Sequence, residues 1–236
     1  MFKAHSLVCS AASALSIIFG VVLLIAGSVY IRDTSFLQSS WNEIYALSIY
    51  SVVIGILTII TAIGLSYVVN RKLPALTILF SVLILIIFVL AMVNLIILAT
   101  NVGNLEDDSY KKTVDLFRNY SNSDLIVSSK GFFGKIQQTF GCCGVKNASD
   151  WINQLFNGSS TPDSCCHQIV PNCGYNALIA KDKIYLKGCA DPIYFYLRTR
   201  FWALLTIDTI LVILLFISAI SGFISEQYIR EQYQEM

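Results

Sequence analysis

The chain has 236 residues, of which 56% are hydrophobic and only 13% are charged. Its mean hydropathy of +0.66 is higher than a soluble domain of this size reaches. The formal net charge of +1 excludes the strongly basic surface that nucleic-acid binding requires, so we expect no nucleic-acid partner. The composition therefore predicts a membrane protein.

Four long apolar runs follow in chain order. Each has the roughly 20 residues that a helix needs to cross the hydrocarbon core of a bilayer. The first run could instead be a cleaved signal peptide, because Lys3 precedes it and small residues lie at 26–28, but it is longer than the apolar core of a signal. We therefore keep it as a span. The expected transmembrane helices cover residues 7–31, 44–69, 74–99 and 201–224.

Six of the seven cysteines lie between the third and the fourth run. An even set of cysteines outside the cytosol indicates disulfides, whereas cytosolic thiols stay reduced. Three N-x-S acceptor sequences for N-glycosylation lie in the same connection. This connection is therefore expected outside the cytosol. The cysteines are Cys142, Cys143, Cys165, Cys166, Cys173 and Cys189, and the acceptors are Asn119, Asn147 and Asn157.

The cysteines set the topology, because the basic residues at the ends of the runs only weakly favour one orientation. The remaining segments are a cytosolic N-terminus (1–6), a small outer loop (32–43), a cytosolic turn (70–73), a large outer loop (100–200) and a cytosolic tail (225–236).

The large outer loop is marginal as a domain without cross-links. Its residues 102–120 have a helical pattern that continues the third span, and residues 131–140 predict a second helix. Periodicity returns at Asp191 and leads into the fourth span, so the two outer continuations are expected side by side. Residues 145–187 are rich in turn formers and predict an irregular, cross-linked segment. The predicted fold is an all-α membrane protein with four transmembrane helices and a disulfide-stapled, mainly helical large extracellular loop.

Three cysteine motifs occur in order inside this loop. Residues 142–144 read Cys-Cys-Gly, residues 162–166 read Pro-Asp-Ser-Cys-Cys, and residues 188–189 read Gly-Cys. Together with the four spans, the short first outer loop and the very short inner turn, these motifs resemble those of the tetraspanin family, and the resemblance covers the whole chain. The pair Asp150-Trp151 is a further family-like detail.

The residues alone leave the disulfide pairing open. The resemblance implies that Cys142 pairs with Cys189 and that Cys143 pairs with Cys165 or Cys166, the other of which would pair with Cys173. We favour Cys143 with Cys165 and Cys166 with Cys173. Family members usually carry several acylated cysteines facing the cytosol. Here Cys9 is the candidate for palmitoylation, with a buried thiol as the alternative.

The same resemblance implies a function. A tetraspanin-type organiser binds other integral membrane proteins and tetraspanins laterally, gathers them into membrane patches, and influences their trafficking, adhesion or signalling. The family also implies a plasma-membrane location and a cavity between the helices that could admit membrane lipid such as cholesterol, with no other cofactor and no metal.

Tyr233 to Met236 fit a Tyr-x-x-apolar sorting signal, as in the six-cysteine, lysosome-associated branch of the family. A sorting adaptor would then bind the tail, and the protein would cycle to late endosomes and lysosomes. A chance match is the alternative.

Partner choice is expected within residues 145–187, because loops on a rigid scaffold usually carry binding. The alternative is that the apolar residues of this segment fill the small core under the disulfides. The candidates for partner binding are Ile152, Leu155, Phe156, Ile169 and Val170.

Small residues recur every seven positions in the first two spans and predict a close helix pair. Asn94 and Asp208 are the strongly polar residues deep within the runs, at similar expected depth. We expect them to face each other inside the bundle as a structural interhelical contact. The repeating small residues are Ser6, Ser13, Gly20 and Gly27 in the first span, and Ser48, Gly55 and Ala62 in the second.

Two other functions compete with the organiser. One is a small transport or channel protein that uses Asn94 and Asp208, and the other is a receptor that binds a soluble ligand through the large loop. Because no Ser/His/Asp nucleophile motif, phosphate loop or His-Glu-x-x-His is present, we expect no enzyme. His167 invites a zinc interpretation, but disulfides would consume the neighbouring thiols.

Overall fold

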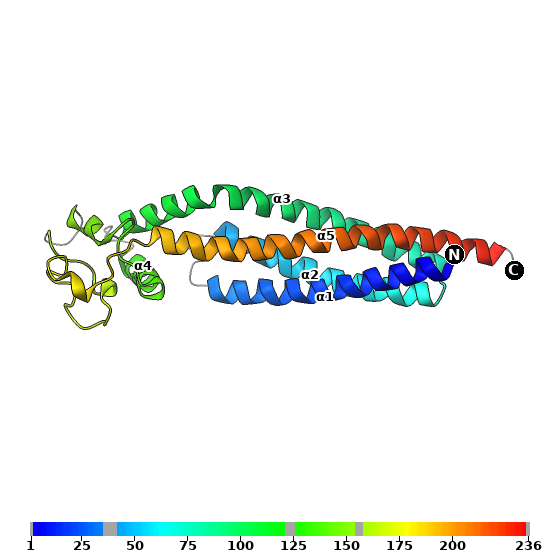
Figure 1. Cartoon of the computed structure of the whole chain (residues 1–236), viewed down its shortest axis with the longest axis horizontal. Coiled ribbons are helices and arrows are strands. Elements are labelled where there is room, and N and C mark those ends of the chain that lie inside the picture. The colour runs from blue at the N-terminus through cyan, green and yellow to red at the C-terminus, as the bar shows by residue number, and fades with distance from the viewer. Residues whose placement is uncertain (1, 35–41, 121–125, 154–157, 235–236) are drawn as a thin grey trace. The chain divides into compact units, whose positions relative to one another are not determined.

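The structure, a computed structural model, describes residues 2–34, 42–120, 126–153 and 158–234. Apart from two isolated β-bridges, the regular elements of these residues are helical, which confirms the predicted fold class. The α-helices are α1 (Phe2–Thr34), α2 (Asn42–Asn70), α3 (Pro74–Asn119), α4 (Ile126–Phe140) and α5 (Ala190–Gln234), as Figure 1 shows. Short 3-10 helices are η3 (Ala148–Asn153), η4 (Asp163–Cys165) and η5 (Lys181–Lys183).

The chain forms two compact units. The membrane unit comprises Met1–Gln38, Asn42–Asn101 and Phe201–Met236. The described residues of the loop unit lie within Val102–Arg200. Helices α3 and α5 contribute residues to both units. Within the membrane unit, the start of α1 and the end of α5 lie at the same end (Figure 1).

Helices α1, α2, α3 and α5 are each long and apolar enough to cross a membrane. The 46 residues of α3 include the predicted continuation of the third span. At the other end of the chain, α5 continues to Gln234, so most of the segment expected as the cytosolic tail (225–236) is helical. No proline or glycine follows Gly222, so nothing in the sequence interrupts the helix there.

Helices α1 and α2 pack closely, as the repeating small residues predict. A Cβ atom added to Gly55 would lie 2.9 Å from the carbonyl oxygen of Gly20, and one added to Gly27 would lie 2.7 Å from Cγ2 of Val52. These glycines therefore let the two backbones approach to a distance that any side chain would prevent. Ser6 begins the same repeat, but its side chain lies outside the described part of the chain.

A three-residue turn joins α2 to α3. The backbone N–H of Leu73 donates to the carbonyl of Val68 at 3.1 Å, and that of Lys72 donates to Val69 at 3.1 Å. Lys72 has a φ of 55°, so this non-glycine residue takes the left-handed conformation that closes a Schellman motif. Pro74 then begins α3, where the missing N–H costs no helical hydrogen bond.

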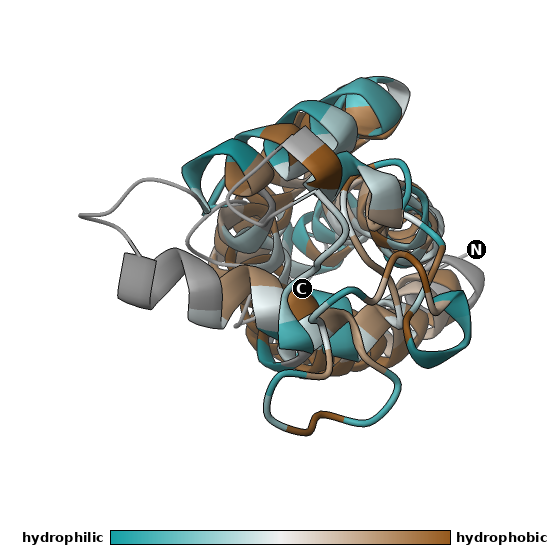
Figure 2. Ribbon diagram, turned by 90° about the vertical axis from the view of Figure 1, so that its left-hand side faces the viewer, coloured by the Kyte–Doolittle hydropathy of each residue, from teal (hydrophilic) through white to brown (hydrophobic). Residues whose placement is uncertain are grey.

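An aromatic cluster forms the core of the loop unit. The side chain of Trp151 is fully buried. Its ring centroid lies 4.6 Å from that of Phe117, 4.9 Å from that of Tyr120 and 6.4 Å from that of Phe133. The loops drawn in front in Figure 2 are largely hydrophilic, with short hydrophobic stretches. Small domains of this kind usually need cross-links to be stable.

Candidate functional site

The Cys-Cys-Gly motif follows α4 and connects three parts of the loop unit. Cys142 is bonded to Cys189, which directly precedes α5, and Cys143 is bonded to Cys165 in η4. All four cysteines are fully buried. Two adjacent residues therefore link the end of α4 both to η4 and to the start of α5.

The glycines of two motifs lie where backbone segments approach most closely. Gly144 has a φ of 73°, and a Cβ atom there would collide with the backbone oxygen of Asn147. A Cβ atom on Gly188 would collide with the backbone of Val145 and Lys146. The N–H of Cys189 donates to the carbonyl of Gly144 at 3.1 Å. Both motifs thus require glycine, because a side chain would separate the two segments.

Asp150 connects this turn to the aromatic core. Its Oδ2 accepts hydrogen bonds from the backbone N–H groups of Val145 at 2.9 Å, Lys146 at 2.7 Å and Asn147 at 3.2 Å. The next residue, Trp151, is the centre of the aromatic cluster. The Asp-Trp pair therefore holds the Cys-Cys-Gly turn over the core.

Two adjacent glutamines of α4 hold η4 in place. The hydroxyl of Ser164 donates to Oε1 of Gln137 at 2.6 Å. Nε2 of Gln138 donates to the carbonyls of Ser164 at 2.6 Å and Cys166 at 3.0 Å. This pair was not predicted from the sequence. Its only signal is two consecutive amides on a helix that precedes a cysteine motif.

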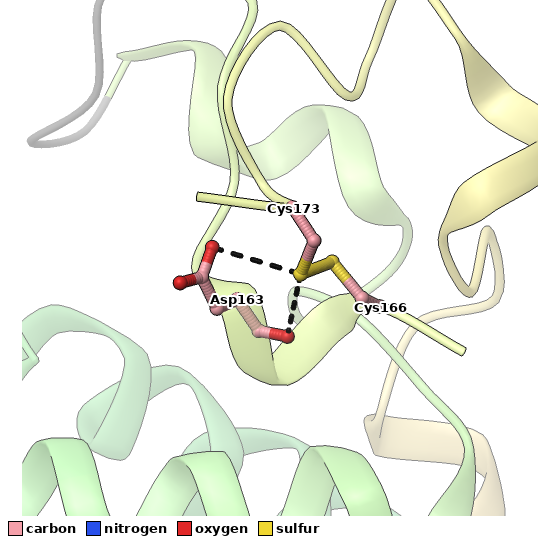
Figure 3. Close-up of side chains that lie close together, drawn as sticks. All are labelled: Asp163, Cys166 and Cys173. Atoms are coloured by element: carbon pink, nitrogen blue, oxygen red, sulfur yellow. Dashed lines mark hydrogen bonds between the residues drawn. A yellow bond between two sulfur atoms is a disulfide. The ribbon is translucent and has the colours of Figure 1, made fainter. Parts of the chain in front are cut away.

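The third disulfide joins Cys166 to Cys173, so the three pairs are those that we favoured from the resemblance. Figure 3 shows Asp163 beside this bond, with its Oδ1 3.6 Å and its carbonyl oxygen 3.4 Å from Sγ of Cys173. By composition these three residues could hold a metal ion. However, the two sulfurs are bonded to each other, and the carboxylate accepts backbone hydrogen bonds from Asn172 at 3.1 Å and Gly174 at 2.9 Å. The cluster therefore organises a loop.

Three of the five residues predicted to bind partners lie within the described part of the chain, and all three are exposed. The exposed fraction is 46% for Ile152, 62% for Ile169 and 53% for Val170. The alternative that these side chains fill the core does not hold for them. Leu155 and Phe156 lie outside the described residues.

Two further apolar side chains in the same segment are more exposed. Tyr175 is 71% exposed and Ile179 is 75% exposed. They lie in consecutive turns that are anchored by hydrogen bonds, among them the N–H of Leu178 to the carbonyl of Ser159 at 3.0 Å. Neither residue was predicted from the sequence, because a run rich in Asn and Gly does not show which apolar side chains point outward.

The described glycosylation acceptors are on the surface. Asn119 is the last residue of α3 and is exposed. Asn147 is also exposed, although its Oδ1 accepts a hydrogen bond from the N–H of Ser149 at 2.9 Å. It forms a β-bridge with Lys187, close to the Cys-Cys-Gly turn. Asn157 lies outside the described residues.

Asn94 and Asp208 meet inside the membrane unit. Nδ2 of Asn94 donates to Oδ2 of Asp208 at 3.1 Å and lies 3.5 Å from Oγ of Ser51. Asp208 is fully buried and Asn94 is 4% exposed. One oxygen of each side chain has no hydrogen-bond partner among the described residues. The contact therefore links α3 to α5, and these two oxygens can still accept hydrogen bonds.

A groove of about 380 Å³ runs between α2 and α3 in the membrane unit. Apart from Tyr50 and Asn94, the residues that line it are aliphatic. The aliphatic lining residues are Leu47, Val53, Ile54, Leu57, Leu90, Val93 and Ile97.

Cys9, the free cysteine, is fully buried among the helices of the membrane unit. Its thiol lies among the hydroxyls of Ser13, Ser221 and Ser225. An acyl transferase could not reach this sulfur without opening the helix packing. The structure therefore favours the buried-thiol alternative over palmitoylation.

The tyrosine of the sorting motif lies near the end of α5. Tyr233 is 53% exposed, and its hydroxyl donates to the carbonyl oxygen of Lys72 at 3.2 Å. Met236 lies outside the described residues.

A comparison with protein families agrees with this architecture. The family model of the tetraspanins matches residues 6–226, which is nearly the whole chain. The chain belongs to the tetraspanin family. It is therefore a multi-pass membrane protein of the plasma membrane. Membership supports a role in organising other membrane proteins, and it is consistent with the expectation that the chain is not an enzyme.

Individual tetraspanins match over shorter stretches. CD63 antigen of Bos taurus is 38% identical over 81 residues, which cover 34% of this chain and 32% of that protein. Tetraspanin-4 of Homo sapiens is 45% identical over 42 residues, covering 18% of this chain and 17% of that protein. Tetraspanin-4 of Mus musculus is 32% identical over 98 residues, covering 40% and 39%. This tetraspanin therefore spans about a third or less of the first two relatives and 39% of the third.

Proposed function

We propose that this tetraspanin binds partner membrane proteins laterally through residues 145–187 of its loop unit. The observation that carries the proposal is the exposure of apolar side chains, at 62% for Ile169 and 53% for Val170, on a segment held by disulfides. Exposed apolar groups on a rigid base can be buried by a partner without the entropic cost of ordering a flexible loop. Through such contacts the protein would gather partners and influence their trafficking, adhesion or signalling.

The test is proximity capture followed by pull-down in mild detergent. A double variant, Ile169→Ser with Val170→Ser, should lose the partners that the intact protein captures. The matched control is Phe195→Ser, which removes a 59% exposed apolar side chain outside the segment. Partners that persist after residues 145–187 are exchanged for those of another tetraspanin would place recognition in the membrane helices instead.

We also propose that Asn94 and Asp208 hold α3 against α5. Their 3.1 Å hydrogen bond is buried, where an unpaired polar group would be costly. Asp208→Leu should lower expression and partner capture, whereas Asp208→Asn, which keeps polar atoms at the same place, should retain more of both. Unchanged expression and capture in Asp208→Leu would refute the role.

The groove between α2 and α3 is suited to a membrane lipid with an apolar body and one hydroxyl. Apart from Tyr50 and Asn94 its walls are aliphatic, and Oδ1 of Asn94 has no partner among the described residues. A sterol has this composition. If a sterol binds there, crosslinking by a photoreactive sterol should decrease in Leu90→Trp, which narrows the groove and leaves the Asn94 side chain itself unchanged.

The sorting motif supports cycling between the cell surface and late endosomes or lysosomes. Tyr233 lies at the surface, with 53% of its side chain exposed. Tyr233→Ala should raise the amount of the protein at the cell surface. An unchanged distribution between the surface and endosomes would show that the motif is not a sorting signal.

A further inference from the structure

The end of α5 is docked on the membrane unit, although its composition is polar. Helix α5 continues to Gln234. Ser225 and Ile229 are fully buried, and Glu226 is 7% exposed. A helix whose side chains are buried at successive turns is held by the bundle. The sorting motif therefore begins in the exposed last turn of a helix that is docked as far as Ile229.

Two contacts join the last turn of this helix to the turn between α2 and α3. The hydroxyl of Tyr233 donates to the carbonyl oxygen of Lys72 at 3.2 Å. In the opposite direction, Nζ of Lys72 donates to Oε1 of Gln232 at 3.4 Å. The same lysine closes the Schellman motif in a left-handed conformation, so the group that receives Tyr233 has a fixed position.

We propose that the turn between α2 and α3 holds the tyrosine of the sorting signal in a closed state that a sorting adaptor must displace. This inference rests on the proposed signal. In the closed state the tyrosine hydroxyl is engaged, and the backbone groups up to residue 234 belong to a helix. An adaptor that adds its peptide as a strand needs an extended backbone with free N–H and C=O groups.

The closed state lowers the apparent affinity of the adaptor in proportion to the fraction of open tails. A closed state favoured tenfold over the open one weakens binding about tenfold, and this cost disappears when the tail is freed. The contacts are few and exposed, so the equilibrium can be shifted by modest changes. Surface residence would then depend on how firmly the turn holds the tail.

The experiment compares variants of the full chain in two assays. One measures uptake from the cell surface, and the other measures binding of a purified adaptor subunit that recognises Tyr-x-x-apolar peptides. A flexible six-residue Gly/Ser insertion after Arg230 frees the signal without changing it. Lys72→Gly removes the contact with Gln232 and keeps the left-handed turn, because glycine adopts this conformation readily. Arg71→Gly is the matched control, since it removes the same charge from the same turn, and Arg71 lies over the ring of Tyr67 and contacts none of the described tail residues.

We expect the insertion to raise adaptor affinity and uptake several-fold, up to about tenfold, and Lys72→Gly to raise them less. Arg71→Gly should behave like the wild type. Adding Tyr233→Ala to the insertion should abolish the gain. If Tyr233→Ala slows uptake of the wild type but the insertion and Lys72→Gly change nothing, the signal is real and the closed state is refuted. If Tyr233→Ala itself has no effect, the signal is refuted and the closed state with it.

Discussion

Asp150 offers the sharpest test of how the loop unit is held together. Its Oδ2 accepts three backbone hydrogen bonds, and in Asp150→Ala the three donors lose their acceptor. Lys146 and Asn147 are exposed, so water can replace the carboxylate there, but Val145 is only 5% exposed. The expected loss is therefore dominated by one buried donor and amounts to about 2–3 kcal/mol of the free energy of unfolding.

The assay is urea unfolding of the full chain in detergent with its disulfides intact, followed by tryptophan fluorescence, because Trp151 lies in the core beside Asp150. Asp150→Asn keeps an oxygen acceptor of the same shape without the charge and should cost about 1 kcal/mol. Asp182→Ala removes an exposed acid of the same loop unit and should change stability by less than about 0.5 kcal/mol. Equal stability of Asp150→Ala and Asp182→Ala would show that the three hydrogen bonds do not hold the turn.

Three further predictions concern packing and protonation. Gly55→Ala should destabilise the protein by about 1–3 kcal/mol, because the new Cβ atom meets the backbone of α1. Gly103→Ala has open space around the new Cβ atom and should stabilise the protein slightly. Thermal unfolding in detergent measures both changes. Burial, assisted by the charge of Asp163, raises the pKa of Tyr120 from 10.0 to about 12, so its contribution to stability is complete below pH 10 and is lost as the pH rises towards 12. Tyr120→Phe should remove this part of the alkaline decline in urea midpoints. Cys9 should react with a maleimide only after denaturation and should incorporate no palmitate analogue, and labelling of the native protein would contradict its burial.

The membrane helices could be predicted because their signals are local. A run of apolar residues long enough to span a bilayer leaves few other structures open, since every backbone polar group must bond within the segment. The close approach of α1 and α2 was also predictable, because Gly20 and Gly55 belong to repeats of small residues. Asn94 and Asp208 could be paired from their depth alone, because the hydrocarbon core offers few polar partners.

The disulfide pairing, unlike the membrane helices, could not be predicted from local sequence signals. The residues alone left it open, and only the resemblance to a family selected a set, which the structure contains. The supporting hydrogen bonds of the loop unit were not predictable at all. Gln137 and Gln138 reach residues more than twenty positions away, and nothing in the local pattern of α4 indicates those partners.

The docked end of α5 was not predicted, because the polar composition of this segment does not indicate that it packs against other helices. Residues from 225 onward are polar and charged, which predicts a solvated tail, yet Ile229 is fully buried and Ser225 with it. Helical propensity continues α5, since no glycine or proline interrupts it, and Ile229 is the apolar side chain that packs this last part against the bundle.

If partners bind where we propose, stability and recognition are carried by different residues of the loop unit, and one scaffold would then serve different partners. Cys142, Gly144, Asp150 and Trp151 combine buried sulfurs, a close backbone approach and an aromatic core, so most changes there destabilise the fold. Ile169, more than half exposed, contributes little to the folded state, and its replacement should change stability by less than about 0.5 kcal/mol. Surface residues that contribute little to stability can be substituted without unfolding the domain. Partner capture by variants at Ile169 should therefore change while their urea midpoints do not, and a parallel loss of both would mean that the two roles are not separable.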